Sequence, residues 1–400
     1  MNAAFSHSQL QTLQLRFQDN SAKLVSVVKD YLDTGVTVFN VLDWTGKAAM
    51  DIIGQTAFHY DFCSLDKKKN ELRDALATLF VVSQSNPSSL ELMFMSLIRL
   101  LPDTLLKFLK LVSTRETRHL SNVGNMLKQV TRKAFSQGMG DGDEGKTDLI
   151  EVLEPFQGRA RATGQMDDNE VKAQLGQAFL SGISNLLDVF LQCSTFVFAG
   201  HETIALTLGW LLYELAAHPE DQNKIREEIS RGQLQNSKLS STEYDSMSFL
   251  NTTIKEALRL HSMVPTLMRT TVQDECFPLS EPIIAKDGKI LKYIPIPKGQ
   301  ILLCSIYMYN RLPSIWGSEA VAYYAIRFGN AFMHWVKTSS WQFAIMEMQV
   351  ILVDLLKHFE FSLPEGMNVL EFPAGPVTVP VVEGKASQGS QVPLHVSFLG

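Results

Sequence analysis

The residues best suited to chemistry lie together in the run FVFAGHET, residues 196–203. An acid, Glu202, and a hydroxyl, Thr203, follow the small residues Ala199 and Gly200 on an otherwise apolar helical pattern. Small residues would let a flat ligand approach the backbone, and a threonine hydroxyl can loosen a helix by bonding a carbonyl one turn back. The pattern therefore suggests a proton-delivery site, with Thr203 bonding an oxygen species and Glu202 relaying protons from solvent. A helix kink with a solvated glutamate explains the same residues equally well.

A second signal is the pair Glu256 and Arg259 in NTTIKEALRLHSMVP. The i, i+3 spacing puts the carboxylate and the guanidinium on one helix face, where they can form a bidentate bond. Most such pairs lie on the surface and contribute little, so this pair alone is a weak indication of a site. Farther along come Arg269 and the run IPKGQ, residues 296–300. The order of these features is more informative than any one of them.

The elements that must position these residues are predicted to be mainly helical. Apolar side chains recur at helical spacing through most of the first 260 residues, including residues 90–111, and again in residues 341–359. The earliest of these series comprises Leu13, Phe17, Leu24, Val27, Val28 and Leu32. The first two thirds of the chain are therefore expected to be α-helical for the most part.

The pattern changes between residues 272 and 306, where prolines punctuate short β-branched runs. Asp287 and Gly288 separate two such runs, which is typical of a β-hairpin turn. The tail, residues 377–398, alternates valine with other residues and contains a Gly-Ser pair, so it is predicted to form a terminal hairpin. The expected fold class is therefore mainly α with a small β subdomain.

The composition is that of an ordinary globular protein, with 400 residues of which 45% are hydrophobic and 20% charged. The length fits one large domain or two medium ones, and no internal repeat is found. The polar residues 136–146 are interpreted as a surface loop and not as a domain boundary, and residues 1–400 are expected to form a single domain. A net charge of −6 and the lack of a basic stripe exclude a nucleic-acid partner. The cysteines are far apart, which indicates reduced thiols and neither a zinc site nor disulfides: Cys63, Cys193, Cys276 and Cys304.

The first 20 residues are polar and lack a charged segment followed by an apolar stretch, so no signal peptide or membrane anchor is indicated. Residues 179–200 come nearest to a membrane span, but Asp188 and Gln192 inside them would be costly in lipid. We therefore expect no membrane anchor in this chain, which as written would be soluble or cytoplasmic.

The succession of these motifs resembles the cytochrome P-450 superfamily, the haem-thiolate monooxygenases, and in particular its fungal microsomal-type members. AGHET and a tryptophan-bearing apolar helix precede E-x-x-R, IPKGQ, and the pairs N-R and W-G. Residues 43–58, DWTGKAAMDIIGQTAF, resemble the family segment before the mid-chain helices. Residues 343–349, FAIMEMQ, resemble the helix after the haem loop. The resemblance covers essentially the whole chain and implies a cytochrome P-450 fold.

The resemblance implies an oxidoreductase with haem (heme), an iron cofactor. Such an enzyme inserts one oxygen atom of O₂ into a small apolar organic substrate, with electrons from an NADPH-dependent reductase. Intact family members are expected on the endoplasmic reticulum membrane. In this chain Glu202 and Thr203 would be the catalytic pair, and Ala199 and Gly200 would contact the cofactor.

The resemblance also assigns roles to four arginine and glutamate side chains. Arg269 falls where the family often places a haem-propionate contact, which suits a guanidinium meeting a carboxylate. Glu256 and Arg259 would form the structural pair under the haem, and Arg327, at the arginine of the family's P-E-R segment, would complete it.

Two departures from the family concern the extent of the chain. Residues 1–9 resemble a stretch that normally lies just after the W-x-x-x-R helix, so the anchor and first helices are expected to be absent and the chain truncated. Residues 175–192 interrupt a family pattern that would otherwise run almost directly from Gln174 to Ser194. A retained in-frame intron is the interpretation we favour. A genuine N-terminal extension of the long helix is the alternative, because the segment is apolar at helical spacing.

The third departure concerns the iron ligand. Residues 329–340, GNAFMHWVKTSS, replace the family's F-x-x-G-x-R-x-C-x-G loop and are also aberrant, with Thr338 at the cysteine position. A threonine hydroxyl cannot act as the electron-donating thiolate. His334 is the one ligand-type side chain there, but a lone histidine beside aromatic residues more often packs or faces solvent.

We therefore expect no metal ligand, little or no haem binding and no monooxygenation by the chain as written. Two alternatives stay open. The chain can be a non-catalytic helical remnant acting as a binding or scaffold protein, or the product of a wrongly assembled gene.

Overall fold

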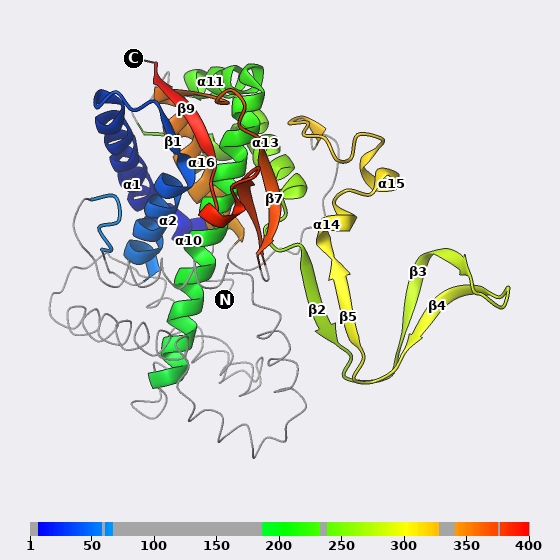
Figure 1. Cartoon of the computed structure of the whole chain (residues 1–400). Helices are drawn as coiled ribbons and strands as arrows, with labels where there is room; N and C mark the ends of the chain where they lie inside the picture. Colours follow the sequence, from blue (N-terminus) through cyan, green and yellow to red (C-terminus); the bar gives the residue numbers. More distant parts are fainter. Residues whose placement is uncertain are drawn as a thin grey trace.

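The computed structural model describes residues 7–57, 61–66, 186–232, 238–327, 341–374 and 377–399. The long helix α10 (Leu186–Ala217) runs through a body of helices, with most of the others packed around its C-terminal half (Figure 1). The bounds of the other helices are α1 (His7–Asp33), α2 (Val41–Ala57), α11 (Pro219–Gly232), α12 (Ser241–Ser246), α13 (Ser248–Leu260), α14 (Ile306–Tyr309), α15 (Pro313–Trp316) and α16 (Trp341–His358).

The C-terminal half of α10 is apolar on nearly all sides, as expected of a helix in the middle of a core. Its buried side chains include Ile204, Leu206, Leu208, Trp210, Leu211, Leu212 and Leu215. The helix ends at Ala217 because the next residue, His218, precedes a proline, which disfavours the helical conformation. Pro219 then begins α11, a position where its missing N–H has no helical partner to lose.

Small residues let α2 and α10 pack closely. A Cβ placed on Gly209 of α10 would collide with the side chain of Leu42 on α2. Nearby, the Thr45 hydroxyl donates to the carbonyl of Ala205 at 3.2 Å. A side chain at position 209 would therefore force the Leu42 side chain to move, and the close contact places α2 along the segment of α10 that follows Glu202.

The helices predicted near the two ends of the chain are confirmed. The apolar series from Leu13 to Leu32 lies within α1, and the segment predicted as residues 341–359 is α16. The two helices pack against each other, with the rings of Phe17 and Phe343 edge to face at a centroid distance of 5.0 Å. This contact brings together parts of the chain more than 300 residues apart.

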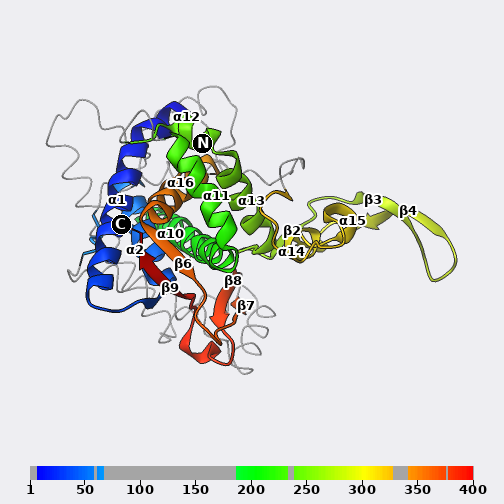
Figure 2. The same ribbon diagram turned by 90° about the horizontal axis from the view of Figure 1, so that it is seen from above.

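Within the described residues, the strands form four small antiparallel sheets with the orders β1-β9-β6, β2-β5, β3-β4 and β7-β8. Their bounds are β1 (Val38–Asn40), β2 (Thr266–Thr270), β3 (Glu275–Ile284), β4 (Ile290–Ile296), β5 (Ile301–Ser305), β6 (Phe359–Ser362), β7 (Val369–Ala374), β8 (Val377–Val382) and β9 (Pro393–Phe398). The sheets β2-β5 and β3-β4 project from the helical body as an arm, which is clearest from above (Figure 2). The mainly α fold with a small β part is thus present.

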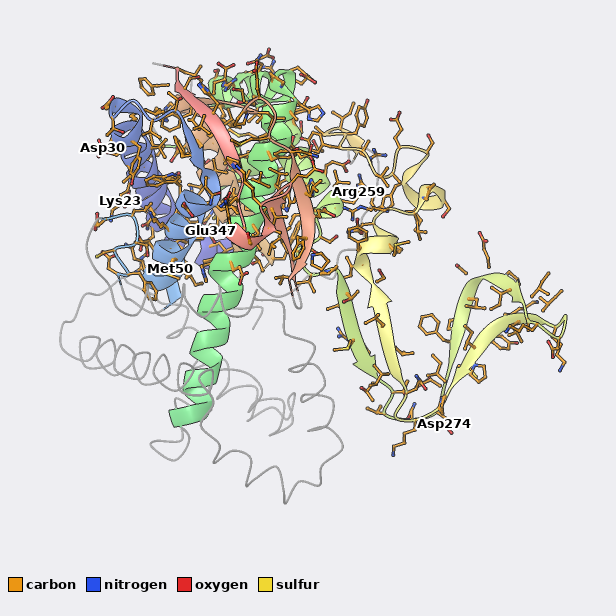
Figure 3. All side chains as sticks on the ribbon, viewed as in Figure 1. Lys23, Asp30, Met50, Arg259, Asp274 and Glu347 are labelled. Atoms are coloured by element: carbon orange, nitrogen blue, oxygen red, sulfur yellow. The ribbon has the colours of Figure 1, made fainter. Side chains whose placement is uncertain are left out.

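The hairpin predicted at Asp287 and Gly288 is confirmed. These residues lie in the turn between β3 and β4, where Ala285 N–H donates to the Lys289 carbonyl at 2.8 Å. Gly288 has a φ of 81°, a conformation that suits glycine. At the other end of these strands, Asp274 marks the bend of the arm, far from Glu347 in the helical body (Figure 3).

The predicted terminal hairpin of residues 377–398 is wrong. β8 pairs with β7, whereas β9 pairs with β1 and β6, so the two strands of the tail belong to different sheets. In β9 the alternate residues Leu394 and Val396 are fully buried in the core. Alternation correctly identified strands, but it does not specify the partner, which is decided by contacts distant in sequence.

The long helix begins earlier than the family pattern suggests, because residues 186–192 form the first turns of α10. This backbone corresponds to the alternative of a helical extension. The predictions for residues 90–111, 136–146, 175–185 and 329–340 lie outside the described residues. Within the described ranges, no helix combines the length and apolar character needed to cross a membrane.

Candidate functional site

Glu202 lies on a buried side of α10. It is 4% exposed, and neither carboxyl oxygen has a hydrogen-bond partner among the described residues. Burial raises the pKa of Glu202 to about 8, since the charged form loses its hydration without gaining a partner. The alternative of a solvated glutamate is therefore wrong. At neutral pH this carboxyl group holds its proton.

Around Glu202, α10 stays helical from Leu186 to Ala217. The hydroxyl that bonds back to the helix belongs to Thr207, which donates to the carbonyl of Thr203 at 2.7 Å. Thr203 itself is half-buried and adjacent to Glu202. The acid and the hydroxyl of the sequence motif are thus both present on an intact helix.

Of the two small residues before Glu202 and Thr203, Gly200 has a role in helix packing. A Cβ on Gly200 would lie 3.0 Å from Cδ1 of Ile53, so the space left by this glycine admits α2. The side chain of Ala199 lies outside the described residues. Contact of Ala199 and Gly200 with a cofactor stays a prediction.

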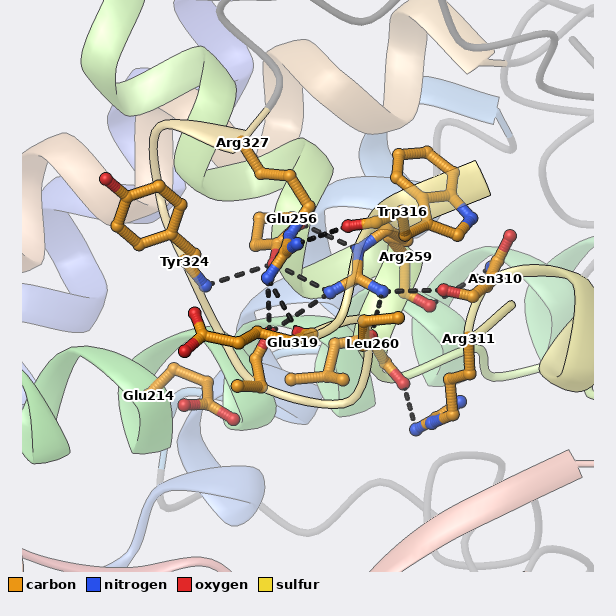
Figure 4. Close-up of polar contacts among 12 residues, drawn as sticks. Glu214, Glu256, Arg259, Leu260, Asn310, Arg311, Trp316, Glu319, Tyr324 and Arg327 are labelled. Carbon is orange, nitrogen blue, oxygen red and sulfur yellow. Dashed lines mark hydrogen bonds and ion pairs between the residues drawn. The ribbon is translucent and has the colours of Figure 1, made fainter. Parts of the chain in front are cut away.

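Glu256 and Arg259 of α13 form the buried pair that their spacing allows. Arg259 donates through Nε to Oε2 at 2.8 Å and through Nη2 to Oε1 at 2.7 Å, and both side chains are fully buried. Arg327 joins them, since its Nε donates to Glu256 Oε1 at 3.1 Å. Figure 4 shows the three side chains converging from two parts of the chain. The alternative of a surface ion pair is wrong here.

The rest of this polar cluster consists of backbone groups, namely carbonyls of residues 310–322 and the N–H of Tyr324, which donates to Glu256 Oε1 at 3.0 Å. Arg259 Nη1 donates to the carbonyls of Asn310 and Ala320, each at 2.6 Å. Arg327 Nη1 donates to the carbonyl of Trp316 at 2.7 Å. Irregular backbone needs such donors because it lacks the regular partners of a helix or sheet. The cluster therefore fixes the chain that leads toward residues 328–340.

Arg269 is not part of this cluster. It lies on β2, in the arm, where its exposed guanidinium donates to the neighbouring Met268 carbonyl at 2.8 Å. The described hydrogen bonds of Arg269 do not reach Glu202 or Thr203. Its role toward a carboxylate of a cofactor stays a prediction.

The described thiols are far in sequence from the start of α16, which the family's iron ligand would precede. Cys276 and Cys304 are exposed on β3 and β5 of the arm, and Cys63 lies in the loop after α2. All three are free thiols, and burial raises the pKa of Cys63. Among the described side chains there is also no group of acids, histidines and cysteines suited to a metal ion. Thr338 and His334 lie outside the described residues.

The sequence analysis missed a second charged cluster, centred on His261. Its ring lies between Glu214 of α10 and Glu371 of β7, at 2.7 and 2.8 Å. Arg311 bonds both oxygens of Glu371, at 2.9 and 3.0 Å. The position of His261 just after the E-x-x-R pair was visible, but its partners lie 47 and 110 residues away. No local pattern could have joined them.

A buried acid on α16 was missed as well. Glu347 is 1% exposed, and its carboxyl oxygens have no hydrogen-bond partner in the described part of the chain. Burial raises its pKa well above 4.5, because the charged form loses its hydration without a described partner. The signal was a lone acid inside the apolar run AIMEMQV.

Comparison with known proteins places this arrangement in a family. The cytochrome P-450 family model matches residues 1–332, most of the chain. The chain belongs to the cytochrome P-450 family. Cytochrome P-450 monooxygenase 91 of Postia placenta is 26% identical, with 91% of this chain and 69% of the relative covered. Cytochrome P-450 monooxygenase claP of Ampulloclitocybe clavipes is 27% identical, with 99% of this chain and 74% of the relative covered.

The fold agrees with this assignment. A crystal structure of a cytochrome P-450 matches with a TM-score of 0.69 over 99% of this chain and 77% of the other, at 15% identity. The cytochrome P-450 fold predicted from the motifs is therefore confirmed. By its family, the chain is an oxidoreductase homologue of haem-dependent monooxygenases.

Haem is the cofactor of the cytochrome P-450 family, and the residues of this chain suit only part of what it needs. On α10, the unpartnered carboxyl group of Glu202 beside Thr203 suits proton handling. On the ligand side, residues 328–340 contain no cysteine, and the described thiols lie in the arm and after α2. The donor set therefore does not fit a haem thiolate.

Proposed function

We propose that this cytochrome P-450 homologue keeps the scaffold of a haem monooxygenase for a small apolar organic substrate but does not itself carry out the oxygenation. The observation that carries the proposal is the donor set. Thr338 occupies the expected cysteine position, in a segment without any cysteine. A cysteine thiolate gives iron the electron density that favours O–O cleavage, whereas a threonine hydroxyl stays protonated at physiological pH.

The substrate class and the NADPH-dependent reductase that would supply electrons belong to the same proposal. The names of the fungal relatives, which are monooxygenases, support them. So do the buried acid Glu202 and the adjacent Thr203, which we propose as the catalytic pair of the ancestral enzyme. We also propose that residues 1–400 form a single domain and that Arg269 contacts a haem propionate.

The test is an absorption spectrum of the purified chain, expressed with haem supplied and reduced under carbon monoxide. We expect no red-shifted Soret band of the thiolate type. Such a band in the unmodified chain would contradict the proposal, because one of the existing cysteines would then have to bind iron.

Two variants at one position sharpen this test. Thr338→Cys supplies a thiol where the family has one, and Thr338→Ser keeps a hydroxyl of similar size. A thiolate band in the cysteine variant alone would show that the ligand is the missing part. A histidine-type spectrum in the unmodified chain that disappears in His334→Ala would instead assign the iron to His334.

A second candidate function, that of a binding or scaffold protein, is favoured by the arm. Several of its apolar side chains are more than half exposed: Met268, Val272, Phe277, Ile284, Ile290, Tyr293, Ile301 and Leu303. Exposed apolar patches of this kind occur at interaction sites. Specific binding of a partner by a chain without a Soret band, abolished by polar substitutions in the arm, would support this function.

The alternative of a wrongly assembled gene has its own test. We propose that residues 175–192 and 329–340 do not occur in the functional family member. Sequencing of the transcript across both segments decides this. A transcript that encodes both segments as written would contradict the proposal of a gene-level error and leave the inactive homologue and the binding protein as the two explanations of the chain.

A further inference from the structure

The charged cluster around His261 joins four separate parts of the fold. His261 follows α13 as its C-terminal cap residue, Glu214 lies near the end of α10, Glu371 is on β7, and Arg311 follows α14. The four side chains are nearly buried, with exposed fractions of 8% for His261, 10% for Glu214, 18% for Glu371 and 11% for Arg311. Charges this far out of water need one another as partners.

The geometry around the imidazole ring determines its charge. Nε2 faces Glu214 Oε1 at 2.7 Å, and Nδ1 faces Glu371 Oε1 at 2.8 Å. An ionised carboxylate only accepts hydrogen bonds, and a neutral imidazole donates from one nitrogen only. Both contacts are satisfied together when both ring nitrogens carry protons, which makes His261 an imidazolium ion.

Two further contacts hold this cation in place. The ring of Trp210 on α10 stacks on the imidazole at a centroid distance of 3.9 Å, with an angle of 1° between the planes. A cation over an indole face is favourable. Arg311 Nη2 donates to Glu371 and to the carbonyl of Leu260, and its guanidinium lies over the Tyr307 ring. Two cations thus balance two carboxylates.

We propose that Glu214, His261, Glu371 and Arg311 form a charged clasp that fastens the β7–β8 hairpin to α10 and α13 and loosens when His261 loses its second proton. Outside the clasp, the described hydrogen bonds from the hairpin to this corner come from uncharged groups. One is the Thr378 N–H, which donates to the carbonyl of Met263 at 2.9 Å. If His261 loses its positive charge, the buried carboxylates of Glu214 and Glu371 remain, and Arg311 is then the single cation of the clasp.

The charge balance of the clasp depends on these four groups and not on the ionisable groups around them. His218 lies 3.9 Å from Glu214 Oε2 and is more exposed than His261. The tyrosines around the cluster have pKa values raised chiefly by burial and are therefore neutral at physiological pH: Tyr213, Tyr307 and Tyr323. Arg259 contacts Glu256 and carbonyl groups and takes no part in the clasp.

The pH window of the clasp follows from the direction of two pKa shifts. Burial disfavours the imidazolium, but hydrogen bonds and charges of Glu214 and Glu371 outweigh it, so the pKa of His261 rises above 6.5. For Glu371, burial is likewise outweighed by His261 and Arg311, and its pKa falls below 4.5. The stabilisation by His261 is complete below pH 6.5 and is lost as the pH rises through the raised pKa. The stabilisation by Glu371 is complete above 4.5 and is lost in more acidic solution.

The experiment is hydrogen exchange of the β7 and β8 amides in the full chain, followed from about pH 6 to about pH 10 and corrected for intrinsic exchange. Protection should fall about tenfold for each unit by which the folded pKa of His261 exceeds its unfolded value. His261→Gln should lack this step and show low protection throughout. His358→Gln is the matched control, because the ring of His358 bonds a backbone carbonyl, that of Asp354 at 2.8 Å. It should retain the step.

A direct measurement of the His261 ring protons keeps the test decisive. ¹⁵N-histidine spectra of the unmodified chain report the protons on both ring nitrogens of His261, and Glu371→Gln should lower the midpoint of its titration. A neutral His261 ring at about pH 7, or hairpin protection without any pH step, would overturn the proposal.

Discussion

Glu256 Oε1 and Oε2 are both bonded by Arg259, at 2.7 and 2.8 Å, in a pair that is fully buried. Because Glu256 Oε1 also accepts from Arg327 at 3.1 Å, one carboxylate holds two guanidinium groups. The guanidinium groups in turn bond carbonyls of the irregular chain after α14. This pair therefore connects the regular helix α13 to a segment whose described backbone is irregular apart from the short helix α15.

Glu256→Gln should destabilise the fold strongly. Removal of the carboxylate charge leaves two guanidinium groups without their counter-ion, and loss of one partner of a buried pair costs about 3–5 kcal/mol. Urea unfolding measures the change. Glu227→Gln is the control, because its pair with Arg231 is 66% and 73% exposed and should matter little. Equal effects of the two substitutions would refute the structural role of Glu256.

Glu202 should make stability fall as the pH rises. Its pKa is about 8 in the folded protein and 4.5 ordinarily, so between these values the folded state binds more protons than the unfolded state. The loss should reach on the order of 5 kcal/mol, since each unit corresponds to about 1.4 kcal/mol. Glu202→Gln, which cannot ionise, should be less sensitive to pH in thermal unfolding. The same slope in both proteins would mean that Glu202 ionises freely.

Glu347→Met should stabilise the protein. The carboxyl group is buried without a partner among the described residues, and methionine fills a similar volume without a polar atom. The expected gain is about 1–3 kcal/mol. Gln349→Met on the same helix is the control, because the Gln349 amide donates to Asn251 Oδ1 at 2.7 Å and should lose stability on replacement. A loss in both variants would show that Glu347 has a partner that matters.

Two glycine substitutions test the contact between α2 and α10. Gly209→Ala should cost roughly 1–3 kcal/mol, because the new methyl group collides with Leu42. Gly46→Ala on α2 should be neutral or stabilising by up to about 1 kcal/mol, since its methyl group would lie 3.7 Å from Ala205 Cβ and alanine favours the helix. Denaturation midpoints of the two variants should therefore move in different directions. A shift in the same direction would contradict the close packing at Gly209.

Local patterns identified the elements that carry the site. The periodicity of α1 and α16, the turn at Gly288 and the spacing of Glu256 and Arg259 each depend on residues a few positions apart. Such signals are written in the sequence because neighbouring residues share one helix face or one turn. The same is true of the motif order that led to the family.

Pairing and burial could not be predicted in this way. β8 and β9 look like a hairpin in sequence, yet their partners are β7, β1 and β6. Glu202 looks equally suited to solvent and to the core until α10 is surrounded by its neighbours. Its burial depends on which face of a largely apolar helix is covered, and a helix with apolar residues on all sides gives no preferred direction.

By itself, the sequence determined the family, the helical fold class and the lack of a cysteine in residues 328–340. These follow from residue types and their order. The tertiary structure alone decided that Glu202 holds a proton and that His261 lies between Glu214 and Glu371. The physical reason is that a pKa depends on hydration and on nearby charges, and both are set by residues that approach only when the chain is folded.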